Sequence, residues 1–297
     1  MNFSNVTTWT IPEGSVTQVT DSNGDIIWQL NTQQTYYITA TYYPVSTTTN
    51  TTILNDSSTV TKIEYNGTEY SPRTYLKFDY KEMNQTVKFY LNSSSVNVYN
   101  LFKGIKRVKT IEIGKDITNV NKDGLKDTLT NSNFVWFRTA TVESGNTVYD
   151  TRGNGIVHTA TNTLVVGGAN TTIDSTVACI GNNALGCVAY ASDTALNNSD
   201  DSSISNSGVL LWDIPGNTCT SLGKQAFYST SKITRINLRG YILRQNQDLP
   251  TNAFTLFGDN HSTIHIPTGT SLANTVWLNE LVTTRQTGYK WTVCADL

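Results

Sequence analysis

The sequence predicts a mainly β fold, in which a short N-terminal β-hairpin and a small β-rich domain precede an irregular solenoid of parallel strands. Three observations predict it. Short segments alternate apolar and polar residues with period two, Asn-Gly pairs separate such segments, and a turn followed by an apolar strand recurs from about residue 96. We expect four parts: an attachment segment at 1–35, a β-rich domain at 36–95, repeats at 96–270 and a C-terminal cap at 271–297.

The first part is expected to contain a hairpin that attaches the chain to something else. Asn23-Gly24 lies between two runs of strand composition, 16–20 and 26–28, and this dipeptide is a strong hairpin signal. A two-stranded piece is too small to bury a core alone, so it must pack on the next domain or on a partner. The residues expected to make that contact are Trp9, Ile11, Ile27 and Trp28.

The second part is rich in residues that favour strands. Four runs have period two, at 36–43, 60–65, 75–80 and 86–91. The Thr/Asn/Ser-rich stretch 46–58 predicts a polar loop, and Asn66-Gly67 predicts a tight turn. The pattern fits either a small β-sandwich or a sheet that caps the repeats.

Four tyrosines fall on both faces of the first of these runs: Tyr36, Tyr37, Tyr42 and Tyr43. Because successive strand residues point to opposite faces, half of them are expected in the core. The other half are available for contact with a carbohydrate or a protein, since amphipathic aromatic side chains favour interfaces.

The third part has an internal repeat. Each unit consists of a short turn motif, a polar turn and an alternating apolar strand. The motifs begin at Asn100, Gly124, Asn183, Gln225 and Asn252, and the strands are 110–113, 139–142, 211–215, 233–238 and 263–267, with an insertion near 191–208. Equivalent positions recur at intervals in the twenties, as from Phe102 to Leu125 and from Phe227 to Phe254. Since one unit cannot bury the apolar face of its own strand, neighbouring units are expected to stack into a parallel ribbon.

The repeat also has a family resemblance. Residues 221–227, Ser-Leu-Gly-Lys-Gln-Ala-Phe, followed by the strand at 233–238, resemble the BspA-like leucine-rich repeat of bacterial surface antigens, whose units run roughly "IG-x-x-AF … L-x-x-I-x-IP". Residues 179–187 look like the same unit with leucine for phenylalanine, and 263–267 supply another "I-x-IP" ending. The resemblance covers roughly 96–270 and implies an irregular leucine-rich-repeat solenoid, although the first two units lack the Ala-Phe pair.

A second resemblance concerns the N-terminus. Residues 9–16, together with 21–24 and Trp28, are similar to leader segments of virion proteins from crAss-like gut bacteriophages. This resemblance implies a fibre or decoration protein that docks to the capsid or tail by its N-terminus and displays its repeats outward. Such families are commonly oligomeric. Neither resemblance brings catalytic residues with it.

Composition restricts the classes of function. Only 15% of residues are charged and the net charge is -2, whereas a nucleic-acid binder normally needs a basic face. The one dense basic cluster, 103–109, is expected to be the solvated face of a turn and strand. No apolar run reaches the length of about 18 residues that spans a bilayer, and no secretory signal is visible. A virion protein needs no such signal, because it is assembled in the host cytoplasm and released by lysis.

We expect no cofactor, no metal site and no catalytic residues. His261 and His265 are four residues apart, but the pattern around them predicts a strand, which places residues by twos rather than by fours. Three carboxylate pairs are expected to be solvated surface groups rather than a glycosidase site. They are Asp123 with Asp127, Asp200 with Asp201, and Glu64 with Glu69.

The four cysteines contain no CxxC pair, which disfavours a zinc site. Cys179, Cys187, Cys219 and Cys294 are expected to be buried free thiols, with a Cys179–Cys187 disulfide as the main exception.

The outward residues of the repeat strands form the candidate ligand face. They are Glu112, Arg235, Asn237 and His265. The preferred hypothesis is a non-enzymatic phage virion-surface protein, a head or tail fibre or a decoration protein. Its partners would be other capsid or tail proteins, a host-surface glycan or protein, and further copies of itself. The alternatives are a bacterial cell-surface adhesin of the same repeat class and a glycan-degrading enzyme.

Overall fold

The computed structural model describes the chain in segments. These are residues 16–20, 22–30, 35–43, 50–79, 83–105, 107–121, 137–173, 175–186, 210–213, 221–222, 226, 233–237, 263–266 and 292–295. For residues 16–19, 27–30 and the strands beyond residue 209, the description is limited to the backbone. The chain forms two compact units, Met1–Thr35 and Tyr36–Leu297.

The first unit contains an antiparallel hairpin. Strand β1, Val16–Thr20, pairs with β2, Ile26–Leu30, so that Thr20 lies opposite Ile26. The Asn23-Gly24 pair lies in the connection, where Gly24 has a positive φ of 87° that an L side chain rarely adopts. Ile26 is 63% exposed. Within the described residues this unit is a short two-stranded ribbon.

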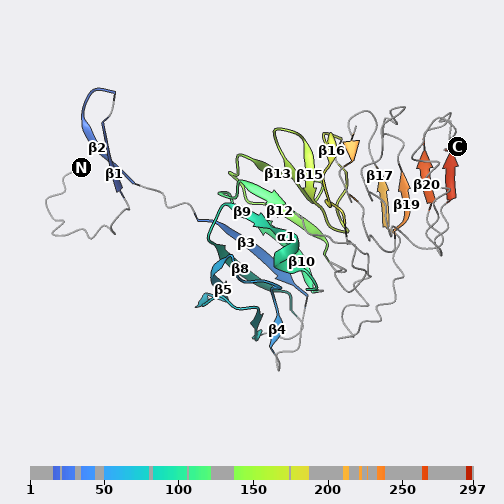
Figure 1. The fold of residues 1–297 in the computed structure, drawn as a ribbon, viewed down its shortest axis with the longest axis horizontal. Helices are drawn as coiled ribbons and strands as arrows, with labels where there is room; N and C mark the ends of the chain where they lie inside the picture. The colour runs from blue at the N-terminus through green and yellow to red at the C-terminus, as the bar shows by residue number, and fades with distance from the viewer. Residues whose placement is uncertain are drawn as a thin grey trace. The chain divides into compact units, whose positions relative to one another are not determined.

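The second unit begins with a six-stranded sheet of order β12-β10-β3-β8-β5-β6 (Figure 1). The strands are β3 (Tyr37–Tyr42), β5 (Val60–Tyr65), β6 (Thr68–Tyr70), β8 (Gln85–Leu91), β10 (Val108–Ile113) and β12 (Thr139–Val142). All neighbours are antiparallel except β10 and β12, which are parallel. The expected boundary near residue 95 crosses this sheet, because β10 lies beside β3.

Two local expectations for this region need correction. The run at 75–80 is a strand only at β7, Tyr75–Leu76, and the stretch 46–58, expected to be a loop, contains the strand β4, Thr51–Thr52. These two short strands pair with each other, and the pairing satisfies the hydrogen bonds of their backbone groups. The alternation of side chains in the sequence does not reveal such a pairing. The Asn66-Gly67 turn between β5 and β6 has positive φ at both residues, 54° and 74°, as a two-residue hairpin turn requires.

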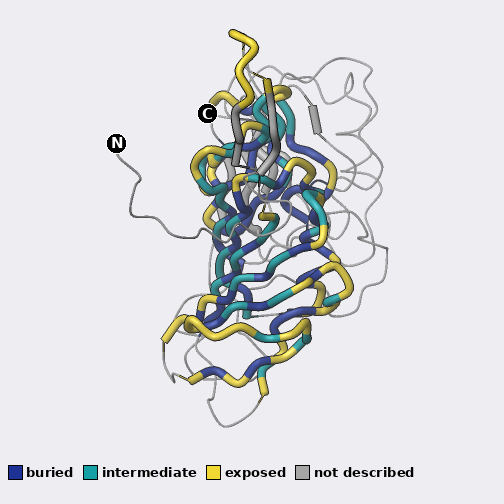
Figure 2. The backbone as a smooth tube through the Cα atoms, turned by 90° about the vertical axis from the view of Figure 1, so that its left-hand side faces the viewer, coloured by how far each residue is buried: buried dark blue, intermediate teal, exposed yellow. Residues whose placement is uncertain are grey.

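The core lies on one face of the six-stranded sheet. Burial alternates along the strands, as the succession of dark blue and teal segments shows in Figure 2. The helix α1, Val98–Phe102, buries four of its five residues, and its first turn is capped by the Asn97 side chain, which accepts a hydrogen bond from the Asn100 N–H. Phe102 packs edge-to-face on Phe89 of β8 with ring centroids 6.1 Å apart, so α1 covers the inner face of the sheet.

Parallel pairs appear beside this sheet and continue after it. Strand β9 (Ser95–Asn97) pairs with β11 (Asn119–Asn121). The next three strands form an antiparallel meander: β13 (Tyr149–Arg152), β14 (Gly155–His158) and β15 (Thr163–Val166). The sheet then continues in parallel from β15 to β16 (Cys179–Ile180) and to β18 (Ser221–Leu222). The stretch 149–166 thus contains hairpins as well as the parallel strands that the sequence predicts.

A separate sheet of four parallel strands occupies the last part of the described chain. Its order is β17 (Leu210–Asp213), β19 (Ile233–Asn237), β20 (Thr263–Ile266) and β21 (Thr292–Ala295). Each strand lies beside the next one along the chain within this sheet. Strand β21 falls in the segment 271–297 that was expected to be a cap.

Most parallel partners are separated by a similar length of chain. Ser95 pairs with Asn119 and Thr110 with Thr139, while Trp212 pairs with Ile236 and Ile264 with Val293. The separation lies in the twenties in each of these pairs. The pairs made by β16 depart from it, with a shorter connection from β15 and a longer one to β18.

The described residues therefore form a mainly β fold with one helix, α1, in which most parallel partners recur at intervals in the twenties. No helix among them has the length and apolar character of a membrane span.

Candidate functional site

The predicted attachment residues belong to the first unit. Trp9 and Ile11 lie outside the described residues. Ile27 and Trp28 lie in β2, in register with Val19 and Gln18 of β1. Because they are consecutive residues of one strand, they fall on opposite faces of the hairpin. A partner that covers one face of this ribbon would therefore meet only one of the two.

The outer face of the six-stranded sheet carries Glu112, the first predicted ligand-face residue. Glu112 is half-buried in β10, where it lies in register with Thr39 of β3 and Thr141 of β12. The row two residues away consists of threonines from four adjacent strands: Thr139, Thr110, Thr41 and Thr86. Two of their hydroxyls, those of Thr41 and Thr86, lie 3.1 Å apart. This part of the face is polar and largely uncharged.

The tyrosines of β3 divide between the core and the outer face. Tyr42 is fully buried and donates a hydrogen bond of 2.6 Å to the carbonyl of Ile53, and its neighbour Tyr43 is also buried. Tyr37 lies on the outer face, where the Lys88 ammonium stands 3.7 Å from its ring centroid. A methyl group at Gly114 would lie 2.9 Å from the Tyr37 ring, so the ring packs against this glycine. Because contacts within the chain occupy it, Tyr37 is a poor platform for stacking a sugar.

The other end of this face is a network of charged side chains around Tyr90 of β8. Tyr90 donates a 2.7 Å hydrogen bond to Glu64, and the Lys62 ammonium lies 4.3 Å from the Tyr90 ring centroid. The hydrogen bond to Glu64, followed by burial, raises the pKa of Tyr90 to about 12. Burial, followed by a hydrogen bond with Glu143, raises the pKa of Tyr37 well above its ordinary value.

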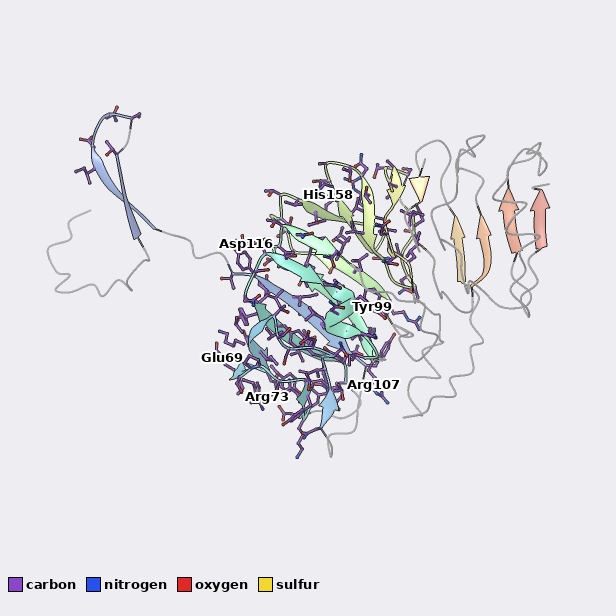
Figure 3. The ribbon with its side chains drawn as sticks, viewed as in Figure 1. Glu69, Arg73, Tyr99, Arg107, Asp116 and His158 are labelled. Carbon is purple, nitrogen blue, oxygen red and sulfur yellow. The ribbon has the colours of Figure 1, made fainter. Side chains whose placement is uncertain are left out.

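The carboxylates of Glu64 and Glu69 are the one carboxylate pair that falls entirely within the described residues. They lie directly opposite each other on β5 and β6, and Figure 3 shows Glu69 beside these strands. Lys62 binds Glu69 at 2.6 Å while Tyr90 binds Glu64. Each carboxylate thus has its own partner on the surface of the sheet, an arrangement that suits a solvated ion network.

The remaining predicted ligand-face residues come together in the four-stranded parallel sheet. Asn237 of β19 is in register with His265 of β20, and Arg235 is in register with Thr263. Since alternate residues of a strand share a face, Arg235, Asn237 and His265 all lie on one face. Glu112 belongs to the other sheet and is not part of this group.

The register of this sheet lines up one apolar row between two rows that are mostly polar. One row on the face of Arg235 and Asn237 contains Asp213, Asn237, His265 and Cys294, and the other contains Leu211, Arg235, Thr263 and Thr292. The row between them, which belongs to the opposite face, contains Trp212, Ile236, Ile264 and Val293 and is entirely apolar.

The polar face is the candidate ligand face, and it includes two residues that the sequence analysis missed, Asp213 and Cys294. The signal that reveals Cys294 is its separation from His265, which lies in the twenties like the intervals between the other partners of this sheet.

The other polar clusters are engaged in holding turns together. Arg152 contacts Asp150 at 3.0 Å and donates to the Asn162 side chain at 2.7 Å. His158, which Figure 3 labels, packs on Tyr149 at 5.4 Å, and its Nδ1 lies 2.9 Å from the Thr161 hydroxyl. Among the residues that the structure describes, no group of three or more His, Cys, Asp or Glu side chains could hold a metal ion.

Cys179 of β16 is a half-buried free thiol, so the alternative of a disulfide with Cys187 is not realised. Its neighbours in register are Thr163 of β15 and Ser221 of β18, neither of which can ionise near neutral pH.

Comparison with known proteins assigns no identity to these features: no family model matches the chain, and no curated protein or solved structure matches it significantly.

Proposed function

We propose that this chain is a non-enzymatic surface protein of a bacteriophage virion, a head or tail fibre or a decoration protein. It docks to the particle through residues 1–35 and displays an irregular leucine-rich-repeat solenoid for binding. The observation that carries the proposal is the set of parallel strands whose partners recur at intervals in the twenties.

The spacing supports the solenoid part of the proposal. Strands that add one after another at such intervals are what a leucine-rich repeat requires, since each unit buries its apolar face only against its neighbours. The apolar row that ends at Val293 fits the inner face of such an array, and the polar rows fit its displayed face. The same architecture leaves the displayed face free to vary with the ligand.

The first unit supports the attachment part. It is a compact unit separate from the rest of the chain, and its two-stranded hairpin is below the size that is stable by itself in water. In this proposal a partner supplies the surface that orders it. Other capsid or tail proteins, or further copies of this chain, are the partners that fit a virion subunit.

The experiment that tests the proposal is deletion of residues 1–35 followed by purification of phage particles. Mass spectrometry should find the full-length chain in stoichiometric copies and the deletion variant in none, while the circular dichroism of the purified variant stays β-type. Trp28→Ala in β2 should lower incorporation, and Gln18→Ala, its neighbour in register, serves as the matched control. Normal incorporation of the deletion variant would refute docking through this unit.

The two other functions predict different results in the same experiment. Absence of the full-length chain from particles, with the chain found on bacterial cells, would replace the proposal with a cell-surface adhesin. Release of reducing ends from host capsule by the purified chain would identify a glycan-degrading enzyme instead.

A further inference from the structure

The sequence contains three Asn-Gly pairs, each at the connection between two paired strands. Asn23-Gly24 belongs to the first unit, whereas Asn66-Gly67 follows β5 and Asn154-Gly155 follows β13 in the second unit. The asparagine of each pair in the second unit has a left-handed φ, 54° at Asn66 and 62° at Asn154. These two pairs therefore share a local conformation and differ in their surroundings.

The Asn66-Gly67 turn is exposed and weakly held. A Cβ added at Gly67 would meet no atom of the described chain within 4 Å beyond its two neighbours. The hydrogen bond that the Asn66 side chain makes within the described residues runs from Nδ2 to the Asp79 carboxylate at 3.4 Å, which is long for such a bond. In this part of the chain no backbone hydrogen bond from another segment holds the peptide group between Asn66 and Gly67.

The Asn154-Gly155 peptide group is fixed by its neighbours. The Asn154 carbonyl accepts hydrogen bonds from the Ala140 N–H at 3.1 Å and from the Thr171 hydroxyl at 3.0 Å. The Asn154 side chain donates to the Asn170 carbonyl at 3.1 Å. Gly155 is buried, and a Cβ added there would collide with the side chains around it. Rotation of this peptide group would break several contacts at once.

We infer that Asn66 is a modification site, where the side-chain amide is lost by spontaneous reaction with the Gly67 nitrogen, while Asn154 is protected. Glycine suits this chemistry because it has no Cβ to hinder its nitrogen or to restrict its backbone. The nitrogen reaches the side-chain carbonyl carbon only after the peptide group between the two residues rotates, so hydrogen bonds that fix this group slow the reaction. The inference goes beyond the proposed function and does not depend on it.

The reaction is balanced with water as its only reagent. The Gly67 nitrogen forms a bond to Cγ of Asn66 as the bond between Cγ and Nδ2 breaks. Nδ2 leaves as ammonia and carries the proton that the Gly67 nitrogen loses, so a five-membered succinimide ring remains. Water then opens the ring at either of its carbonyls, which yields aspartate or isoaspartate. For each residue modified, a water molecule is consumed and an ammonia molecule is released.

Both products disturb the edge of the six-stranded sheet. A carboxylate at position 66 would stand near that of Asp79, which now accepts a hydrogen bond from the Asn66 amide, and like charges repel. Isoaspartate also adds a carbon atom to the main chain of a two-residue turn, whose length sets the pairing of Tyr65 with Thr68. The modified chain should therefore lose hydrogen-exchange protection in β6, the edge strand of this sheet.

The test is to incubate the full-length chain in mildly alkaline buffer and to follow deamidation of each peptide by mass spectrometry, with chromatography to separate aspartate from isoaspartate. In the folded chain Asn66 should react at least about tenfold faster than Asn154, because the Asn154 peptide group must first lose its hydrogen bonds. In urea the two rates should agree within about threefold, since only fluctuating local structure then remains.

Two variants separate the effect of the hydrogen bonds from that of the sequence. Thr171→Val removes a hydrogen bond to the Asn154 carbonyl, so it should accelerate Asn154 about threefold or more and leave Asn66 unchanged. Thr172→Val, at the neighbouring exposed position, is the matched control and should alter neither rate. Equal rates at Asn66 and Asn154 in the folded chain, a ratio that persists in urea, or an unchanged Asn154 rate in Thr171→Val would overturn the inference.

Discussion

The six-stranded sheet and the four-stranded parallel sheet organise the residues of their polar faces in different ways. In the first, strands from distant parts of the chain bring unlike side chains together, and these satisfy one another: Lys88 covers Tyr37, and Glu64 accepts a hydrogen bond from Tyr90. In the second, each strand lies beside the next strand of the same sheet along the chain, and the register lines up one apolar row between two mostly polar rows.

This difference indicates which surface is available for binding. A face whose aromatic rings and carboxylates already have partners must break those contacts to take up a ligand. The rows of the parallel sheet repeat one kind of position from strand to strand, so a substitution there changes the face without changing the core. The parallel sheet is therefore the better candidate for recognition, and the six-stranded sheet for support.

The largest effect is expected where the register of the parallel sheet is tested directly. Ile264→Asp should unfold this sheet if the apolar row is the inner face that we propose, because an unpaired carboxylate there costs about 3–5 kcal/mol in addition to the lost apolar burial. His265→Asp, one residue along the strand, should change stability by less than about 0.5 kcal/mol, since it lies on the polar face. Hydrogen exchange of the backbone amides of β19, β20 and β21 measures both. Equal loss of protection in the two variants would mean that the rows are assigned to the wrong faces.

The next effect concerns the core of the six-stranded sheet. Phe89 is fully buried and packs on Phe102, so Phe89→Ala should lower the free energy of unfolding by about 3–5 kcal/mol. Thr86→Ala, on the exposed side of the same strand, is the control and should cost less than about 0.5 kcal/mol. Urea denaturation compares them. A loss below about 1 kcal/mol for Phe89→Ala would show that this sheet does not depend on a tightly packed core.

A smaller effect tests the close packing on the outer face. A methyl group added by Gly114→Ala would collide with the Tyr37 ring, and we expect a loss of about 1–3 kcal/mol. In a Tyr37→Ser background the same substitution should cost less, because the ring is gone. The coupling energy of this double-mutant cycle, obtained from four urea unfolding curves, should be about 1 kcal/mol or more. A coupling near zero would contradict the contact.

The smallest effect is a loss of stability at alkaline pH. Burial raises the pKa of Tyr42 well above its usual value, while the pKa of Tyr90 is about 12. In the unfolded chain both ionise near the ordinary value of about 10, so above that pH the unfolded state binds fewer protons and stability falls as pH rises. For Tyr90 the loss ends once the pH passes about 12. Thermal melting in steps across this range should show a shallower decline for Tyr42→Phe than for the wild type, and equal slopes would exclude Tyr42 as a source.

The sequence predicts individual strands well wherever one face meets the core. The run 60–65 coincides with β5, and 86–91 lies within β8, because burial of alternate residues leaves a period-two pattern. The pairing of β10 with β3 could not be predicted, since a pattern shows that a strand has an apolar face but not which strand lies beside it. The same limit explains why the occupied ring of Tyr37 was not foreseen: Lys88 and Gly114 are distant in sequence.

For the candidate site, the alternation of the repeat strands indicates that Arg235, Asn237 and His265 share a face. It does not indicate which residues stand beside them. Cys294 and Asp213 join the row only through the register, and no single segment of sequence contains it. The residues that form one row across a parallel sheet can be predicted from a sequence only when the number of residues between paired positions is known.

The offsets between partners also bear on how the gene can change. Partners in the four-stranded sheet recur at intervals in the twenties, whereas a much longer stretch of chain separates Cys179 from its neighbour Ser221. Connections of different length therefore join strands of the same kind. We expect that an in-frame duplication or deletion of one whole interval would return the chain to an equivalent edge of the sheet, so that variants could differ in length while keeping both the apolar row and the polar ones.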